Sequence, residues 1–177
     1  LNANTGSLIW KFRGAPADDK VLGNGRLVSM WPARGAPVLY DNTIYFAAGI
    51  WPFAGTFYYA VSAETGKELW CNSGSGLDWH KQPHKGSEAF AGIAPQGYLA
   101  ASEDTVIVPS GRAVPGAYDR RTGKFRYFHH QRYSGQGYFA SIINDGERNF
   151  FTNGPRFYKL SDGIRKGEHR GYTALGN

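Results

Sequence analysis

The stretch VSAETGKELW, from Val61 to Trp70, decides the fold because close variants of it recur along the chain. The other two copies are LNANTGSLIW (Leu1 to Trp10) and YDRRTGKFRYF (Tyr118 to Phe128). Each copy has a polar turn-forming run, then Thr-Gly, then a β-type run that carries an aromatic residue. The Thr-Gly pairs lie at 5/6, 65/66 and 122/123, which gives a period of about sixty residues. Such a period predicts repeated units, each a small sheet that cannot bury its own face.

One repeat unit is expected to hold four short antiparallel strands. In the clearest unit the turn signals Asp-Asn and Thr-Gly separate runs rich in aromatic and β-branched residues. The strands expected there are Gly35–Asp41, Thr43–Gly49, Thr56–Ser62 and Lys67–Asn72. A meander of this kind is the shape of a propeller blade. We therefore predict an all-β fold, a partial β-propeller of about three four-stranded antiparallel blades.

The rest of the chain divides around this unit. We expect residues 1–12 to be the outer strand of a preceding blade, 35–72 and 97–129 to be blades, and 137–170 to be a degenerate blade. Residues 13–34 and 73–96 are expected to be long loops on one face. Because propellers close with four to eight blades, we expect further blades of a parent chain, or other chains, to complete the ring. The chain starts inside a repeat motif, so its natural N-terminus is expected to be missing.

The recurrent residues are assigned a structural role, that of docking one blade onto the next. Glycine accepts positive φ, and the preceding threonine can bond nearby backbone groups. The aromatic residue four positions beyond the glycine is expected to pack between neighbouring blades; ligand stacking is the alternative. The predicted docking residues are Thr5, Gly6, Trp10, Thr65, Gly66, Trp70, Thr122, Gly123 and Tyr127.

Composition limits the classes of protein. Aromatic residues make up 15% of the 177 residues, beside 24 Gly and 9 Pro, which suits short strands joined by turns. No apolar run is long enough to span a membrane as a helix. The net charge is +6, and its basic residues are interpreted as a solvated face rather than an anionic-polymer site, so no nucleic-acid partner is expected. With Cys71 as the only cysteine, no internal disulfide or Cys-based zinc site can form.

The repeated motif resembles the tryptophan-docking motif of PQQ-like, or quinoprotein-type, β-propeller repeats, and is closest to large secreted planctomycete-type members. Ala3–Trp10 and Ala63–Trp70 carry the motif, Tyr118–Tyr127 has tyrosine in place of tryptophan, and Leu160–Gly163 is a remnant. In the dehydrogenases of this family, the resemblance would imply a vicinal disulfide and an acidic calcium site. This sequence has neither, so PQQ and calcium are expected only if flanking blades supply their site. The resemblance also implies a periplasmic or secreted location.

Unusual residues gather in the segments expected on one face. Trp31 and Arg34 end the first long loop, Trp79 and His80 lie in the second, and Trp51, Arg112 and Arg156 follow matching glycines. Together these side chains suit a planar or anionic ligand. The alternative is that they pack the loops onto the blades and satisfy backbone carbonyls.

Metal and catalytic sites have weaker support. His80 and His84 have helical spacing, but the Gln82-Pro83 step disfavours a helix there. His129 and His130 are adjacent, and in a strand they would point to opposite faces. We therefore predict no metal site and no catalytic residues; a dyad of Asp78 with His80 is the remaining alternative.

The functional expectation combines these points. The chain is expected to be a non-catalytic scaffold, or a ligand- or protein-binding segment, of a larger PQQ-like propeller protein. The competing hypothesis is a segment of a PQQ-dependent dehydrogenase whose cofactor residues lie outside these residues. A third hypothesis is an anionic-polymer binder acting through the C-terminal basic face.

Overall fold

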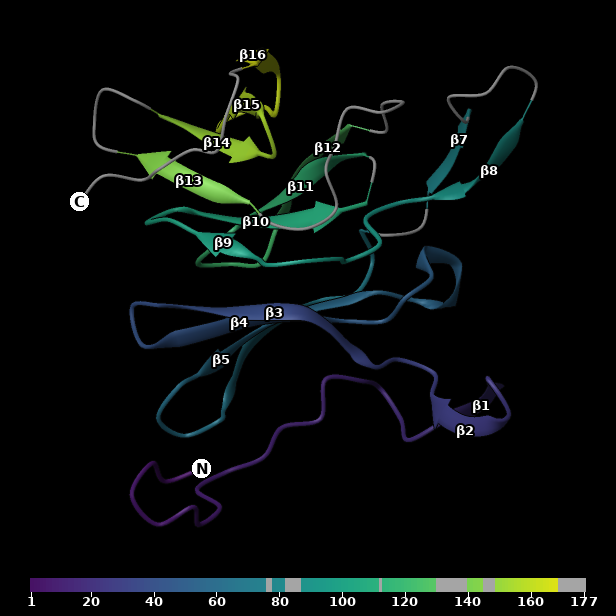
Figure 1. Ribbon diagram of the computed structural model, residues 1–177, viewed down its shortest axis with the longest axis vertical. Helices are drawn as coiled ribbons and strands as arrows, with labels where there is room; N and C mark the ends of the chain where they lie inside the picture. The colour runs from purple at the N-terminus through teal and green to yellow at the C-terminus, as the bar shows by residue number, and fades with distance from the viewer. Residues whose placement is uncertain (76–77, 82–86, 112, 130–139, 145–148, 169–177) are drawn as a thin grey trace.

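The chain folds as a stack of β-sheets that follow one another from the N-terminus to the C-terminus, as the computed structural model in Figure 1 shows. The structure describes residues 1–75, 78–81, 87–111, 113–129, 140–144 and 149–168. Within these residues the only helical element is a short 3₁₀ turn, η1 (Pro52–Ala54). The fold is all-β, and its three four-stranded sheets are the blades of a partial propeller.

Each blade is a simple antiparallel meander in which chain order equals strand order. The first blade consists of β3 (Ala33–Tyr40), β4 (Thr43–Ala48), β5 (Phe57–Ser62) and β6 (Glu68–Asn72). The second consists of β9 (Ala100–Ala101), β10 (Thr105–Ser110), β11 (Ala113–Asp119) and β12 (Phe125–His129). The third consists of β13 (Ser141–Asn144), β14 (Asn149–Asn153), β15 (Arg156–Lys159) and β16 (Arg165–Glu168).

One turn geometry recurs four times, once before each outer strand or outer segment. In every copy a glycine amide donates to the carbonyl four residues earlier, at 2.8–2.9 Å. The four donor–acceptor pairs are Gly6–Asn2, Gly66–Ser62, Gly123–Asp119 and Gly163–Lys159. All four glycines have φ of +69° or +70°, a conformation that costs glycine little because it has no Cβ. In three copies the amide two residues beyond the threonine donates to its Oγ1 at 3.3 Å.

A docking contact links each outer segment to the next blade. The indole Nε1 of Trp10 donates to the carbonyl of Ala63 at 3.0 Å, and that of Trp70 donates to the carbonyl of Arg120 at 2.9 Å. The hydroxyl of Tyr127 donates to the carbonyl of Leu160 at 2.6 Å. Each aromatic ring also lies against the glycine of the next turn. A Cβ on Gly66, Gly123 or Gly163 would stand 2.5–2.6 Å from ring atoms of Trp10, Trp70 or Tyr127 respectively.

The core lies between the blades, because each sheet turns one row of side chains toward its neighbour. The row Tyr45, Ala60, Trp70 of the first blade packs with Val106 and Tyr118 of the second. On its opposite face the second blade presents the cross-strand row Ala100, Ile107, Ala117, Tyr127. This row packs against Ala140, Phe151, Tyr158 and Leu160 of the third blade. The second blade is therefore buried on both faces.

The segments expected to be long loops carry strands of their own. Residues 13–34 contain the hairpin β1 (Lys20–Gly23) and β2 (Arg26–Ser29), and residues 73–96 contain β7 (Asp78–Lys81) and β8 (Glu88–Ala91). The first hairpin closes through Asn24 and Gly25, whose φ values of 51° and 74° fit the two-residue turn that matches strand twist. The segments expected as long loops therefore contain hairpins that pair locally and outside the repeat.

Two expected strands also differ in the structure. Residues 1–12 form no strand. In the blade expected over residues 97–129, the inner strand covers only Ala100–Ala101. There the backbone bonds across blades: the amide of Ala36 donates to the carbonyl of Gly97 at 3.0 Å, and that of Leu99 donates to Ala36 at 3.3 Å. The segment before β9 therefore hydrogen-bonds to the first blade before it enters the sheet of the second blade.

Candidate functional surface

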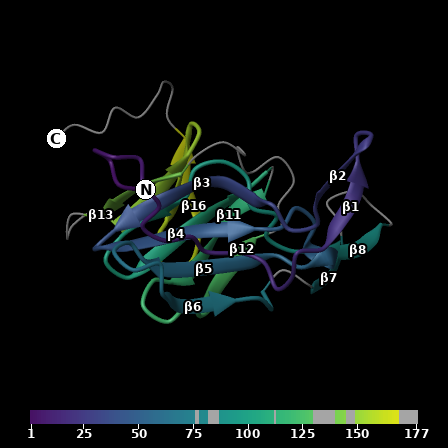
Figure 2. The same ribbon diagram turned by 90° about the horizontal axis from the view of Figure 1, so that it is seen from below.

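Three elements that leave the blades meet at one end of the molecule. In Figure 1 the hairpins β1–β2 and β7–β8 project on the same side of the stack, and Figure 2 shows both at that end again. The 3₁₀ turn η1 joins them: Trp31, two residues beyond β2, donates from its indole Nε1 to the carbonyl of Ala54 at 2.6 Å. Strand β8 also contacts η1.

Trp31 itself is an anchor and is half-buried. Beyond its bond to η1, its ring meets that of Phe57 edge to face, at a centroid distance of 5.9 Å. The amide of Gly49, at the end of β4, donates to the carbonyl of Pro32 at 3.0 Å. These contacts hold the base of the first hairpin against the first blade, so Trp31 packs this segment onto the blade.

Trp51 and Phe53 form an exposed aromatic pair on η1. Their rings are stacked at a centroid distance of 6.1 Å, and 60% and 65% of the two residues is exposed. Pro52 at the first position of the turn fixes the backbone between them. The amide of Ala54 donates to the carbonyl of Trp51 at 2.9 Å, which closes the turn. The rings of Trp51 and Phe53 are therefore exposed to solvent on a closed turn that contains proline.

A second exposed aromatic pair lies on the β7–β8 hairpin. Trp79 and Phe90 are direct cross-strand partners, and their rings meet edge to face at 5.0 Å. The indole Nε1 of Trp79 donates to the Glu88 carboxylate at 2.9 Å. Both aromatic residues remain more than half exposed. Strand β8 brings this pair beside η1, so the structure places Trp51 and Trp79 on neighbouring elements.

Two other residues predicted for this face, Arg34 and Arg156, lie on different blades. Arg34 is half-buried on β3 of the first blade, where its backbone partner is Ala47. Arg156 lies on β15 of the third blade, with its Nε 3.7 Å from the Glu168 carboxylate. Arg112 and the side chain of His80 lie outside the described residues. The expected ring of aromatic and cationic side chains is thus represented by its aromatic members.

A polar network that the sequence reasoning missed binds Arg126 in the second blade. Its guanidinium donates to Thr105 Oγ1 at 2.6 Å, to Asp104 at 3.2 Å and to Asp119 at 2.8 Å. The bond from Arg126 is the main reason that the pKa of Asp119 falls to about 2. Arg126 is the extra residue at a bulge where Tyr127 faces Ala117 and Phe125 faces Tyr118. The sequence shows the Thr-Gly turn but gives no signal for that bulge.

A second missed residue, Arg120, lies between the first two blades and is 8% exposed. Its Nε donates to the carbonyl of Glu103 at 2.7 Å, and Nη1 donates to the hydroxyl of Tyr45 at 3.1 Å. Its guanidinium stands 4.8 Å from the ring centroid of Tyr40. Arg120 therefore joins a turn of the second blade to two strands of the first.

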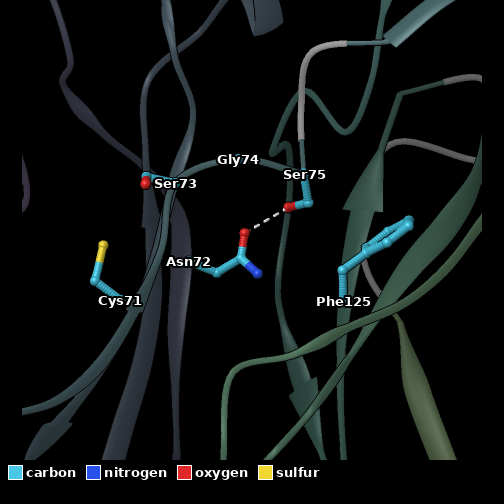
Figure 3. Close-up of a pocket in the computed structure, with 6 residues that line it drawn as sticks. All are labelled: Cys71, Asn72, Ser73, Gly74, Ser75 and Phe125. Atoms are coloured by element: carbon cyan, nitrogen blue, oxygen red, sulfur yellow. Dashed lines mark hydrogen bonds between the residues drawn. The ribbon is translucent and has the colours of Figure 1, made fainter.

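A pocket of about 440 Å³ opens where the end of β6 faces β12. Figure 3 shows its lining: Cys71, Asn72, Ser73, Gly74, Ser75 and Phe125. Ser75 Oγ donates to Asn72 Oδ1 and also bonds the hydroxyl of Tyr118, both at 2.7 Å. Asn72 in turn donates to the carbonyl of Gly123 at 2.8 Å. Burial raises the pKa of the Cys71 thiol, so the neutral, weakly nucleophilic form is favoured.

The described residues contain no group of three or more His, Cys, Asp or Glu side chains arranged to hold a metal ion. Among the same residues, the structure has no helix of the length and hydrophobicity that crossing a membrane requires.

Comparison with known proteins gives distant likenesses only. No protein-family model and no curated protein sequence matches the chain. A quinohemoprotein alcohol dehydrogenase from Comamonas testosteroni is similar with a TM-score of 0.46 and 16% identity, over 77% of this chain and 20% of that one. A europium-containing methanol dehydrogenase gives a TM-score of 0.47 and 14% identity, over 78% and 25% respectively. The chain thus matches a fifth to a quarter of each of those proteins.

Proposed function

We propose that this chain is a non-catalytic scaffold and binding segment of a larger PQQ-like β-propeller protein. One observation carries the proposal: four described side chains suited to acid–base or anion chemistry, those of Asp104, Asp119, Arg120 and Arg126, are bound into contacts within and between blades. Arg120 joins the first two blades, and Arg126 holds Asp104 and Asp119. The loop elements at one end instead expose aromatic rings that make no such contact with the blades.

The proposed partners are the remaining blades of a parent chain, or other chains that complete the ring. Apolar exposure at the first blade and the segment before it supports this: Leu8, Ile9 and Leu39 are each 60–65% exposed. Apolar side chains at a sheet face are normally covered by a neighbouring layer. We expect addition of the preceding parent segment to protect the amides of β3 and β4 from hydrogen exchange; unchanged protection would contradict this.

The proposed location is extracytoplasmic, periplasmic or secreted, and it rests on the resemblance of the repeat motif. Fractionation of cells that express the parent protein tests it, with a cytoplasmic enzyme as the control. Recovery of the protein only in the cytoplasm would contradict the proposal.

Titration with PQQ in the presence of calcium tests the non-catalytic role. We expect no saturable change in quinone absorbance and no transfer of electrons from a primary alcohol to an artificial acceptor. A saturable quinone complex that oxidises alcohol would instead assign the chain to the dehydrogenases. Two variants show where a quinone binds if it does bind. Trp51→Ala removes an exposed ring from the loop face, and Leu39→Ser removes an exposed residue from the open face of the first blade.

A further inference from the structure

The loop elements form one apolar surface with a defined set of exposed side chains. The apolar loop surface comprises Leu22, Leu27, Trp51, Phe53, Trp79 and Phe90, each 52–77% exposed. The Trp31 bond to Ala54 ties the first hairpin to η1, and β8 contacts η1 from the other side. The turn η1 therefore neighbours both hairpins, which Figures 1 and 2 show projecting on the same side of the stack.

The five tryptophans of the chain divide sharply between two environments. Trp10, Trp31 and Trp70 are half-buried, and each donates its indole N–H to a backbone carbonyl. Trp51 and Trp79, in contrast, are 60% and 58% exposed, and both belong to the apolar loop surface. Large exposed rings that cluster on one side indicate a binding surface rather than scattered surface residues.

The first hairpin adds a projecting apolar tip with cationic flanks. Leu22 and Leu27 are direct cross-strand partners next to the turn, so they share one side of the hairpin. They are 77% and 69% exposed. The charged residues within β1 and β2 are Lys20 and Arg26, both exposed and both cationic, whereas the acidic Asp18 and Asp19 precede β1 at the base of the hairpin, farther from the tip. A hairpin with an apolar tip and cationic side chains behind the tip suits insertion into a lipid layer with anionic headgroups.

We propose that the apolar loop surface binds the headgroup boundary of an anionic lipid bilayer. This inference deepens the proposed binding role and rests on it. Tryptophan suits that boundary because its ring is apolar while its N–H stays hydrated. Leu22 and Leu27 reach the acyl region from the hairpin tip, and Lys20 and Arg26 stay at the anionic headgroups. The chain thus lies on the bilayer without spanning it.

Vesicle co-sedimentation tests the proposal with the whole chain. We expect binding to phosphatidylcholine vesicles that contain phosphatidylglycerol, accompanied by a blue shift of tryptophan emission. The double variant Leu22→Ser, Leu27→Ser should bind about tenfold more weakly, because it removes the apolar tip. The double variant Lys20→Gln, Arg26→Gln should bind the anionic vesicles about tenfold more weakly and should lose most of the salt dependence.

A matched control is the double variant Leu39→Ser, Ile164→Ser, which removes two apolar residues of the blades that are more than half exposed. This variant should bind vesicles as the wild type does, and circular dichroism should show the same fold for every variant. No vesicle binding by the wild type, or equal binding by the tip variant, overturns the proposal. The quinone titration does not involve vesicles, so the two tests fail independently. Absence of vesicle binding would leave the non-catalytic role standing. A quinone complex would contradict the non-catalytic role without deciding whether the chain binds vesicles.

Discussion

At the scale of single residues, a turn glycine can be required for two reasons: its positive φ and its close contact with an aromatic ring. Gly123 has φ of +70°, and its Cα lies against the ring of Trp70, so closely that a Cβ would stand 2.5 Å from a ring atom. Gly6 has φ of +69° in the same kind of turn, but no atom lies within 4 Å of its Cβ position. The two positions therefore separate backbone strain from ring contact.

Gly123→Ala is expected to lower the free energy of unfolding by about 2–4 kcal/mol, through left-handed strain and overpacking against Trp70. Gly6→Ala is expected to lower it by only about 1–2 kcal/mol, through strain alone. Urea denaturation of the two variants measures the difference. Equal losses would show that the ring contact does not require glycine.

The Arg126–Asp119 pair gives the stability a pH dependence. Because the folded pKa of Asp119 is about 2, below the usual value near 4, the carboxylate stabilises the fold above pH 4. That contribution is lost as the pH falls from about 4 through about 2. Asp119 is 30% exposed at its side chain, so solvent screening reduces the contribution to about 1 kcal/mol.

Asp119→Asn provides the test, because the amide keeps an oxygen that can accept from the turn amides of Arg121 and Thr122. We expect the variant to be less stable than the wild type by about 1 kcal/mol at pH 6. The gap should close near pH 2, as measured by urea denaturation at both values. A constant gap across this range would assign the loss to the turn and not to the ion pair.

At the scale of strands, the third blade exchanges a large and a small residue. Where Ala60 faces Trp70 and Ala117 faces Tyr127, the third blade has Phe157 facing Gly167. The ring of Phe157 fills the space over the glycine, since a Cβ on Gly167 would stand 2.6 Å from it. The aromatic residue has therefore moved from the outer strand to its inner partner.

This exchange predicts that Phe157→Ala removes most of the destabilisation caused by Gly167→Ala. Gly167→Ala alone should destabilise the chain by about 1–3 kcal/mol, because the added methyl group meets the Phe157 ring. In the background of Phe157→Ala the same substitution should cost less than about 0.5 kcal/mol. A double-mutant cycle by thermal or urea unfolding measures the coupling. Additive effects would contradict the contact.

The sequence predicted the strands within the repeat better than those outside it. Turn residues such as Asp41-Asn42 and Thr65-Gly66 bracket β4 and β5, and β6 follows the second turn, because these turns restrict the backbone locally. The β1–β2 hairpin was missed although Asn24-Gly25 is a strong hairpin signal, since the repeat supplies no second copy for comparison. For the site, Trp51 and Trp79 were expected on one face from their positions in the connecting segments; both are exposed, and their role in ligand binding stays a prediction. The roles of Arg120 and Arg126 could not be predicted, because their partners are set by contacts between strands.

At the scale of the whole molecule, Arg120 couples two blades that are far apart in sequence. Arg120→Met is expected to lower the free energy of unfolding by about 2–3 kcal/mol, because it leaves the Glu103 carbonyl and the Tyr45 hydroxyl without their donor. Tyr45→Phe should cost about 1 kcal/mol, with a coupling of about 1 kcal/mol in the double variant.

The neighbouring Arg121 is the control for this prediction. Its side chain is 67% exposed and pairs at the surface with Glu103 at 3.3 Å. Arg121→Met should therefore change the stability by less than about 1 kcal/mol. Equal losses for the two arginines, measured by urea denaturation, would contradict a role of Arg120 in coupling the blades.

The docking contacts also have a direction along the chain, which matters while the protein is being made. Trp10 bonds a carbonyl 53 residues later, Trp70 one 50 residues later and Tyr127 one 33 residues later. Each aromatic residue is synthesised before its acceptor. At about 5–20 residues per second, Trp10 waits roughly 3–10 seconds for its acceptor to be synthesised. During that interval the Trp10 ring lacks its partner, so this is a period of synthesis in which a chaperone would protect the chain.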